Sequence, residues 1–165
     1  TMQPFEEVDL ATWRKIVDVN LFGSLQLTRE VVGPMKAQGG GSVVFVNSMI
    51  VRKVLPNQGG YTISKAALLS AAQVLAKELG PHKIRVNSIL PGAMWGPNVE
   101  LWLKMRAEEH GTTEQQEYEE MASEMALGIV PPDDDVANAA VFFASDLSRV
   151  ITGQALNVNG GEVFS

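Results

Sequence analysis

The chain has 165 residues, of which 45% are apolar and 19% are charged, and its formal net charge is -6. This composition is typical of one soluble globular domain, and the acidic balance argues against a nucleic-acid surface, which needs clustered Lys and Arg. The lack of cysteine excludes disulfides, zinc thiolates and thiol nucleophiles. No signal peptide and no apolar run long enough to span a membrane is found, so we expect a cytoplasmic protein with no membrane partner.

The N-terminal part of the chain predicts one long helix. Apolar side chains recur three, four or seven residues apart over residues 11–37, and Asp9 is a suitable N-cap. Gly33 and Pro34 fall near the end of this helix, where proline removes a backbone hydrogen bond. We therefore expect a kink or tightening in its last turns.

A strand and a second helix follow. The run SVVFVNS at 42–48 is β-branched and continuously apolar, which predicts a strand buried on both faces. The spacing of Ala and Leu predicts a helix over 61–79, and Gly80 and Pro81 supply its stop signal.

The next segments predict a strand, a rigid loop and a helical flap. RVNSIL at 85–90 has the pattern of a second buried strand, and PGAMWGP at 91–97 that of a loop leaving its end. Residues 98–128 are helical in pattern but rich in Glu. Repulsion among the carboxylates favours a solvated helix face and a mobile flap.

The C-terminal part predicts one more helix and one more strand. PPDDD at 131–135 opens a helix whose acidic first turn suits the helix dipole, and QALNVNGG at 154–161 forms the closing strand. Strands alternating with helices predict an α/β fold with a parallel sheet covered on both faces. Only three strands are predicted, so one sheet edge would expose an unpaired apolar strand that a missing segment or another copy must cover.

A tyrosine and a lysine lie four residues apart at the start of the second helix, in YTISK at 61–65. Residues at this spacing share a helix face, and a nearby ammonium favours the phenolate, so Lys65 could tune Tyr61 for proton transfer. Ser48 follows a buried strand, where ligand crevices form in α/β sheets, and its hydroxyl could serve as a second donor. The alternative is structural: Tyr61 packs, Lys65 points into water and Ser48 caps the next turn.

These residues resemble the short-chain dehydrogenases/reductases, whose signature is this serine followed thirteen residues later by YxxxK. The resemblance extends to VNLFG at 19–23, NSILPG at 87–92 and GQALNVNGG at 153–161, and thus covers essentially the whole chain. It implies the C-terminal portion of a doubly wound Rossmann-type parallel sheet, and one incomplete domain over residues 1–165.

The resemblance also implies an oxidoreductase that transfers a hydride between NAD or NADP and a secondary alcohol or ketone. Tyr61 would be the catalytic acid/base, Ser48 the donor to the substrate oxygen, Lys65 the tuner and ribose ligand, and Asn20 the holder of a water in the proton relay. The remaining predicted cofactor contacts are Tyr61, Lys65, Pro91, Gly92 and Met94. The predicted substrate contacts are Met49, Trp95 and Trp102. Around the loop after the Pro-Gly turn, Met94, Trp95, Trp102 and Met105 would line an apolar pocket closed by the flap at 98–128, or alternatively would only pack the flap onto the sheet. Without its spacing to Ser48, Asn20 would be read as a helix-interior residue bonding a backbone carbonyl. The family likeness further implies a homodimer or homotetramer through the helices at 11–37 and 61–79.

The sequence departs from the family pattern in two ways. Gly96 stands where members usually place a threonine, so no cofactor contact by a side chain is assigned there. Family chains are longer, and no Gly-rich loop joins a strand to a helix here. We therefore expect that Thr1 is not the natural start and that these residues alone turn over no substrate.

Two other functions stay open at this point. One is a non-catalytic assembly fragment in which YTISK is vestigial, and the other is a sugar-nucleotide epimerase or dehydratase, a class that shares YxxxK. The closing LNVNGG argues against the epimerase by resemblance only. His82 and His110 have no second ligand at metal spacing, so we expect both to be solvated and no metal to be bound.

Overall fold

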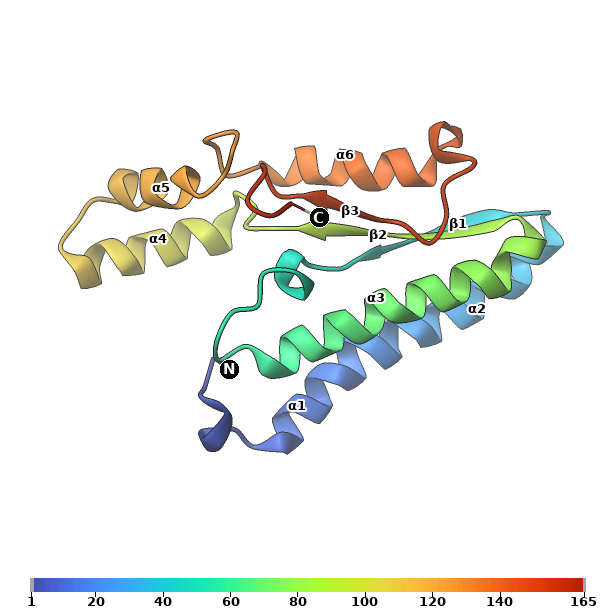
Figure 1. The fold of residues 1–165 in the computed structure, drawn as a ribbon, viewed down its shortest axis with the longest axis horizontal. Helices are drawn as coiled ribbons and strands as arrows, with labels where there is room; N and C mark the ends of the chain where they lie inside the picture. The colour runs from blue at the N-terminus through green and yellow to red at the C-terminus, as the bar shows by residue number, and fades with distance from the viewer. Residues whose placement is uncertain (1, 165) are drawn as a thin grey trace.

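The computed structural model describes residues 2–164, which form a three-stranded parallel sheet flanked by helices (Figure 1). The helices and strands are α1 (Leu10–Val17), α2 (Ser24–Ala37), β1 (Gly41–Val46), α3 (Gly59–Leu79), β2 (Ile84–Pro91), α4 (Pro97–His110), α5 (Glu114–Ser123), α6 (Asp133–Ala144) and β3 (Ala155–Val158). A π-helical turn, Asp18–Gly23, joins α1 to α2, and short 3₁₀ turns flank several elements. No described helix is both long enough and apolar enough to cross a membrane.

The sheet has the order β1-β2-β3, and both pairings are parallel, as predicted. Val46 is opposite Ile89 at one end of the β1 pairing, and Pro91 is opposite Val158 in β3. The carboxyl ends of all three strands therefore lie at the same edge of the sheet, where ligand crevices form in α/β folds.

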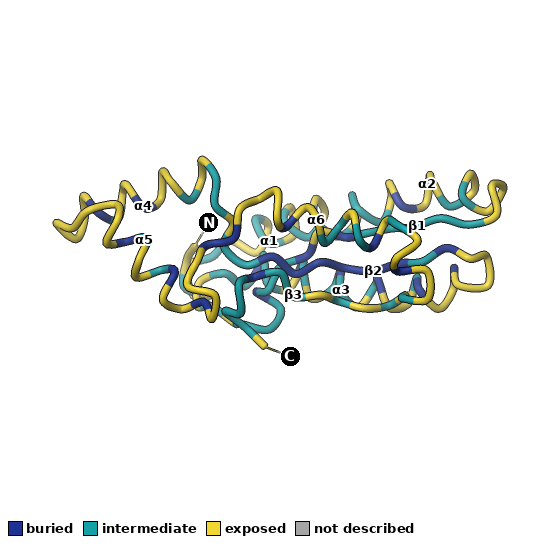
Figure 2. The backbone as a smooth tube through the Cα atoms, turned by 90° about the horizontal axis from the view of Figure 1, so that it is seen from above, coloured by how far each residue is buried: buried dark blue, intermediate teal, exposed yellow. Residues whose placement is uncertain are grey.

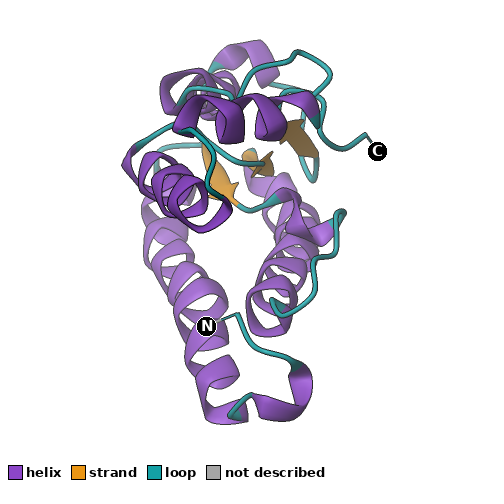
Figure 3. Cartoon of the chain, turned by 90° about the vertical axis from the view of Figure 1, so that its left-hand side faces the viewer, coloured by secondary structure: helices purple, strands orange, loops and turns teal. Residues whose placement is uncertain are grey.

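Helices cover both faces of the sheet, so the expected layered α/β architecture is confirmed (Figure 3). α3 packs on one face, where Leu68, Ala72 and Val86 belong to a buried cluster. α6 packs on the other face, where Phe143 and Ile89 are buried together. The central strand β2 is the most deeply buried element (Figure 2).

Three element predictions need correction. β1 is not buried on both faces: Val46 is 56% exposed and Gly41–Val44 are only half-buried, because within residues 2–164 no strand pairs with its outer edge. The helix irregularity lies at Asp18–Gly23 rather than near Pro34, and α2 continues through Pro34 to its end at Ala37.

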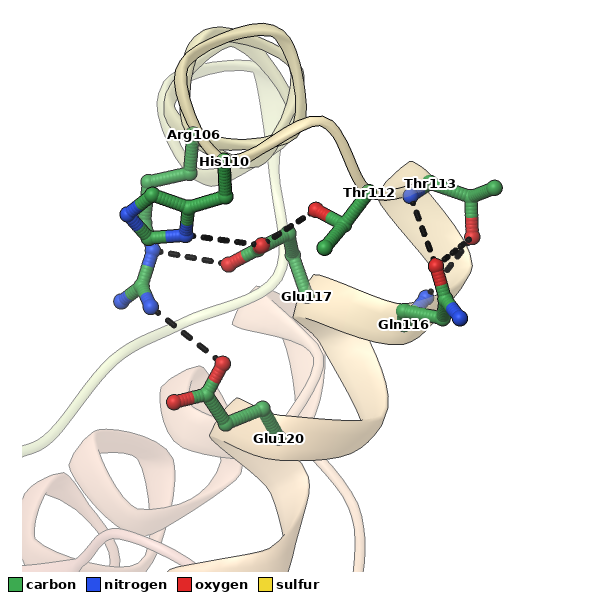
Figure 4. Close-up of polar contacts among 7 residues, drawn as sticks. All are labelled: Arg106, His110, Thr112, Thr113, Gln116, Glu117 and Glu120. Carbon is green, nitrogen blue, oxygen red and sulfur yellow. Dashed lines mark hydrogen bonds and ion pairs between the residues drawn. The ribbon is translucent and has the colours of Figure 1, made fainter.

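The third correction concerns the Glu-rich segment, whose two helices share a buried carboxylate. We call α4, α5 and their connecting turn, residues 97–123, the α4–α5 hairpin. Glu117 is only 3% exposed, so the Glu-rich helix does not present all its carboxylates to solvent. Its side chain accepts a hydrogen bond from Thr112 and pairs with Arg106 at 2.8 Å and with His110 at 3.0 Å (Figure 4). His110 is exposed, as predicted, and its ring nitrogen pairs with this carboxylate.

Candidate active site

The first turn of α3 positions Tyr61 by close packing against α1. A Cβ added to Gly59 or Gly60 would lie 2.4 Å or 2.8 Å from the Trp13 ring, so only glycine allows this approach. α3 begins at Gly59, which places Tyr61 in its first turn and Lys65 one turn later. The close packing of α3 on Trp13 thus explains why glycine occupies the two positions before Tyr61.

Lys65 lies between Tyr61 and the carboxyl end of β1. Its Nζ is 5.7 Å from the centroid of the Tyr61 ring and donates a hydrogen bond of 2.9 Å to the carbonyl oxygen of Val46. Burial lowers the pKa of the ammonium from its ordinary value, because desolvation disfavours the charged form. An ammonium has three donors, so two beyond the Val46 contact can serve a ligand.

Ser48 follows β1 and caps the short turn Met49–Val51. Its Oγ accepts a hydrogen bond of 3.2 Å from the Ile50 amide, as the structural alternative predicts. Because that bond uses a lone pair of Oγ, the hydroxyl hydrogen remains able to donate. The capping role and the proposed donor role are therefore compatible.

Asn20 lies in the π-helical turn and reaches α3 through a serine. Its Nδ2 donates to Ser64 Oγ at 3.0 Å, and Ser64 Oγ donates to the Tyr61 carbonyl oxygen at 2.7 Å. Ser64 is fully buried. This residue was missed in the sequence, although it stands between Tyr61 and Lys65 in YTISK. It links Asn20 to the turn that carries Tyr61.

The Pro91–Gly92 turn closes the site at the end of β2. A Cβ on Gly92 would lie 2.9 Å from Glu162 Oε2 and 3.0 Å from Met49 Sδ, so three segments converge at this glycine. Met94 is 38% exposed beyond the turn. The predicted cofactor and substrate residues Gly92 and Met49 are thus neighbours.

The two predicted pocket tryptophans lie in different environments. Trp95 packs edge-to-face on Tyr118 of α5 with ring centroids 5.2 Å apart, and borders a cavity of about 500 Å³. Trp102 is 40% exposed and lies 4.7 Å beneath the Arg106 guanidinium. Trp95 therefore holds the hairpin onto the sheet, while Trp102 lies on the hairpin surface.

The site offers part of a cofactor cradle. Lys65 donors and the Pro91–Gly92 turn at the carboxyl ends of the strands suit the ribose and nicotinamide end of a dinucleotide. Within residues 2–164 no strand passes into a helix through a Gly-rich phosphate loop. Nor do the described residues contain a group of three or more side chains that could ligate a metal.

Comparison with known proteins decides the family. The family model of enoyl-(acyl carrier protein) reductase matches residues 1–162. The chain belongs to the short-chain dehydrogenase/reductase family. An uncharacterized short-chain type dehydrogenase/reductase of Sinorhizobium fredii is 34% identical over 96% of this chain and 60% of its own length.

Solved structures of the same family share the fold. L-sorbose reductase from Gluconobacter frateurii, complexed with NADPH and L-sorbose, superposes with a TM-score of 0.93 at 25% identity, over 100% of this chain and 63% of that one. Carveol dehydrogenase from Mycobacterium avium, in complex with NAD, gives 0.88 at 28% identity, over 98% and 60%. The Rossmann-type short-chain dehydrogenase/reductase fold is confirmed, and the chain spans about three fifths of the length of these relatives.

Proposed function

We propose that the whole protein containing these residues transfers a hydride between NAD or NADP and a secondary alcohol or ketone. The observation that carries this proposal is the placement of the Lys65 ammonium beside the Tyr61 ring and on the carbonyl oxygen of Val46, two residues before Ser48. Family membership and the NADPH and NAD complexes of two relatives support the choice of cofactor.

Tyr61, Lys65, Ser48 and Asn20 have separate roles in one proton transfer. The nicotinamide, when bound, supplies or accepts the hydride. The Tyr61 hydroxyl gives its proton to the carbonyl oxygen during reduction, and the resulting phenolate takes it back during oxidation. The Lys65 ammonium, 5.7 Å from the ring centroid, stabilises the negative charge that develops on the phenolic oxygen. Ser48 donates a hydrogen bond to the same oxygen as negative charge develops on it. Asn20, through Ser64, holds the first turn of α3 in place.

The activity is proposed for the whole protein and not for these residues alone. The described part of the chain holds the proton-transfer groups but offers no Gly-rich loop for the phosphates of a dinucleotide. The substrate, a small alcohol or carbonyl compound, and assembly into a homodimer or homotetramer through α1, α2 and α3 are part of the same proposal.

Replacing Tyr61 with Phe in the whole protein tests the proposal. We expect kcat/KM to fall by about 10² to 10⁴-fold, because the ring remains but the hydroxyl proton is lost. Tyr118→Phe is the matched control, since Tyr118 packs on Trp95 in the hairpin. Unchanged turnover in Tyr61→Phe would favour the assembly-fragment alternative, and an epimerised sugar nucleotide as product would favour the epimerase.

A further inference from the structure

Lys53 joins three segments that are far apart in the sequence. It lies in the stretch between Ser48 and Tyr61, which we call the catalytic loop, residues 49–58. Its Nζ lies 2.6 Å from Glu124 Oε2 and 2.8 Å from Glu162 Oε1. Glu124 is the C-cap residue of α5, and Glu162 follows β3 near the C-terminus.

The residues that follow α5, 124–128, which we call the hairpin base, and residues 159–164, which we call the C-terminal segment, already form one unit without Lys53. The Leu127 amide donates to the Gly160 carbonyl oxygen at 2.9 Å, and a Cβ on Gly161 would lie 2.7 Å from Ala126 Cβ. Lys53 ties this unit to the catalytic loop, and the neighbouring Arg52 adds a contact of 2.9 Å to Asn157 of β3.

The two ion pairs of Lys53 differ in burial. The Glu162 side chain is 7% exposed and that of Glu124 is 62% exposed, while Lys53 is 32% exposed. Removing the partner of a buried charge is strongly destabilising, whereas an exposed pair contributes little and is screened by salt. Hydrogen bonds to Glu124 and then Glu162 raise the pKa of Lys53, so it stays charged through the neutral range. The Glu162 contact is therefore the fixed one, and the Glu124 contact is the one that releases easily.

The buried pair lies against the candidate active site. Glu162 Oε2, the oxygen that Lys53 does not contact, has no hydrogen-bond partner among the described residues. It lies beside Gly92 and close to Met49, the residue after Ser48. A shift of the Lys53–Glu162 pair would therefore displace both the Pro91–Gly92 turn and the start of the catalytic loop.

We propose that Lys53 is a positioning residue that holds the catalytic loop against the hairpin base and the C-terminal segment. The Glu162 contact sets the distance between the catalytic loop and the Pro91–Gly92 turn, and the Glu124 contact closes the hairpin base over the loop. The effect on turnover rests on the proposed function, whereas the tie between the three segments does not.

Lys53→Met in the whole protein tests the tie by amide hydrogen exchange. We expect peptides covering 49–58 and 121–128 to exchange about tenfold faster or more, because a buried carboxylate loses its counterion. Glu124→Gln should accelerate exchange of the same peptides only about two- to fivefold, and should add nothing in the Lys53→Met background. Lys104→Met is the control, since Lys104 is exposed on α4 and makes no ion pair within residues 2–164.

Kinetics of the same variants test positioning. Lys53→Met should lower kcat per folded site by about tenfold, and Lys53→Arg should restore most of the loss, whereas a merely structural role would reduce only the folded fraction. Exchange in Lys53→Met equal to that of the Lys104→Met control would overturn the proposal, as would additive effects of Lys53→Met and Glu124→Gln. If Lys53→Met does not fold, amide exchange of the same peptides is measured in Glu124→Gln instead. The dependence of that exchange on salt then tests the tie.

The two proposals fail in distinguishable ways. If Lys53→Met exchanges faster but the unsubstituted protein has no oxidoreductase activity, the tie is retained. The positioning role and the proposed function are then both overturned. Activity that depends on Tyr61, together with unchanged exchange in Lys53→Met, would retain the function and overturn the tie.

Discussion

Lys65 is placed where its charge is costly for folding and useful for chemistry. Half-burial lowers its pKa, so the charged form is disfavoured in the folded protein. Since its folded pKa lies below the unfolded one, this ammonium lowers stability at neutral pH, and the penalty fades as pH rises through the folded pKa. Its hydrogen bond to the Val46 carbonyl oxygen lies at an exposed strand end where water can replace it.

Lys65→Met should therefore separate stability from activity. We expect the midpoint of thermal unfolding to be no lower than that of the unsubstituted protein, and kcat to fall by about 10²-fold or more because the positive charge beside the Tyr61 ring is lost. Lys77→Met, at an exposed position of the same helix, controls for the loss of a positive charge. A large loss of stability with retained kcat would contradict this role for Lys65.

At the residue scale, spacing predicted the members of the candidate site that share local structure. Tyr61 and Lys65 are four apart on α3, and Ser48 ends a recognisable strand, so helix and strand geometry bring them to one edge of the sheet. Ser64 was overlooked because a buried serine in a helix has no distinctive pattern. Lys53 and Glu162 are 109 residues apart, and only the folded chain brings them together.

At the element scale, the α4–α5 hairpin is stabilised by a polar cluster around Glu117. Three neighbours lower the pKa of the Glu117 carboxyl, although its burial acts to raise it. The hydrogen bond from Thr112 has the largest effect, followed by those of His110 and Arg106. A carboxyl with a lowered folded pKa contributes stability above its unfolded pKa, and this contribution is lost as pH falls through the folded value. The cluster should therefore hold the hairpin together until the pH falls below the ordinary Glu value of 4.5.

Glu117→Gln tests this account of the hairpin. Amide exchange in residues 97–123 should be faster than in the unsubstituted protein at neutral pH, because Arg106 and His110 lose their anionic partner. The difference between the two proteins should shrink as the solution is acidified below about pH 4. Glu119→Gln, at an exposed position of α5, is the control. Equal exchange in Glu117→Gln and in the unsubstituted protein at neutral pH would contradict this role for Glu117.

Element type was more predictable than element environment. Capping and stop residues predicted the positions of the helices, as Asp9 shows by accepting the Ala11 amide. The π-helical turn Asp18–Gly23 was not predicted, because apolar spacing and helix propensity do not distinguish a π-helical turn from an α-helical one. The exposure of Val46 could not be predicted either, since burial of a strand depends on its neighbours.

At the scale of the whole molecule, the sheet ends at β1 with an apolar groove beside it. This groove is lined by side chains of α2 and β1, among them Leu27, Val31 and Phe45. The chain also spans about three fifths of its relatives' length. The proposed catalysis therefore concerns the whole protein, in which the substrate carbonyl would receive hydride on its carbon and a proton from Tyr61 on its oxygen.

The most direct test of that claim follows the hydride itself. The whole protein is incubated with reduced cofactor carrying deuterium at the transferable position and with a ketone substrate, and the product alcohol is analysed by mass spectrometry. We expect deuterium on the carbinol carbon of the product. Almost no labelled product should form in the same time when Tyr61→Phe replaces the unsubstituted protein. Product alcohol without deuterium on that carbon, or equal labelling by Tyr61→Phe, would contradict the claim.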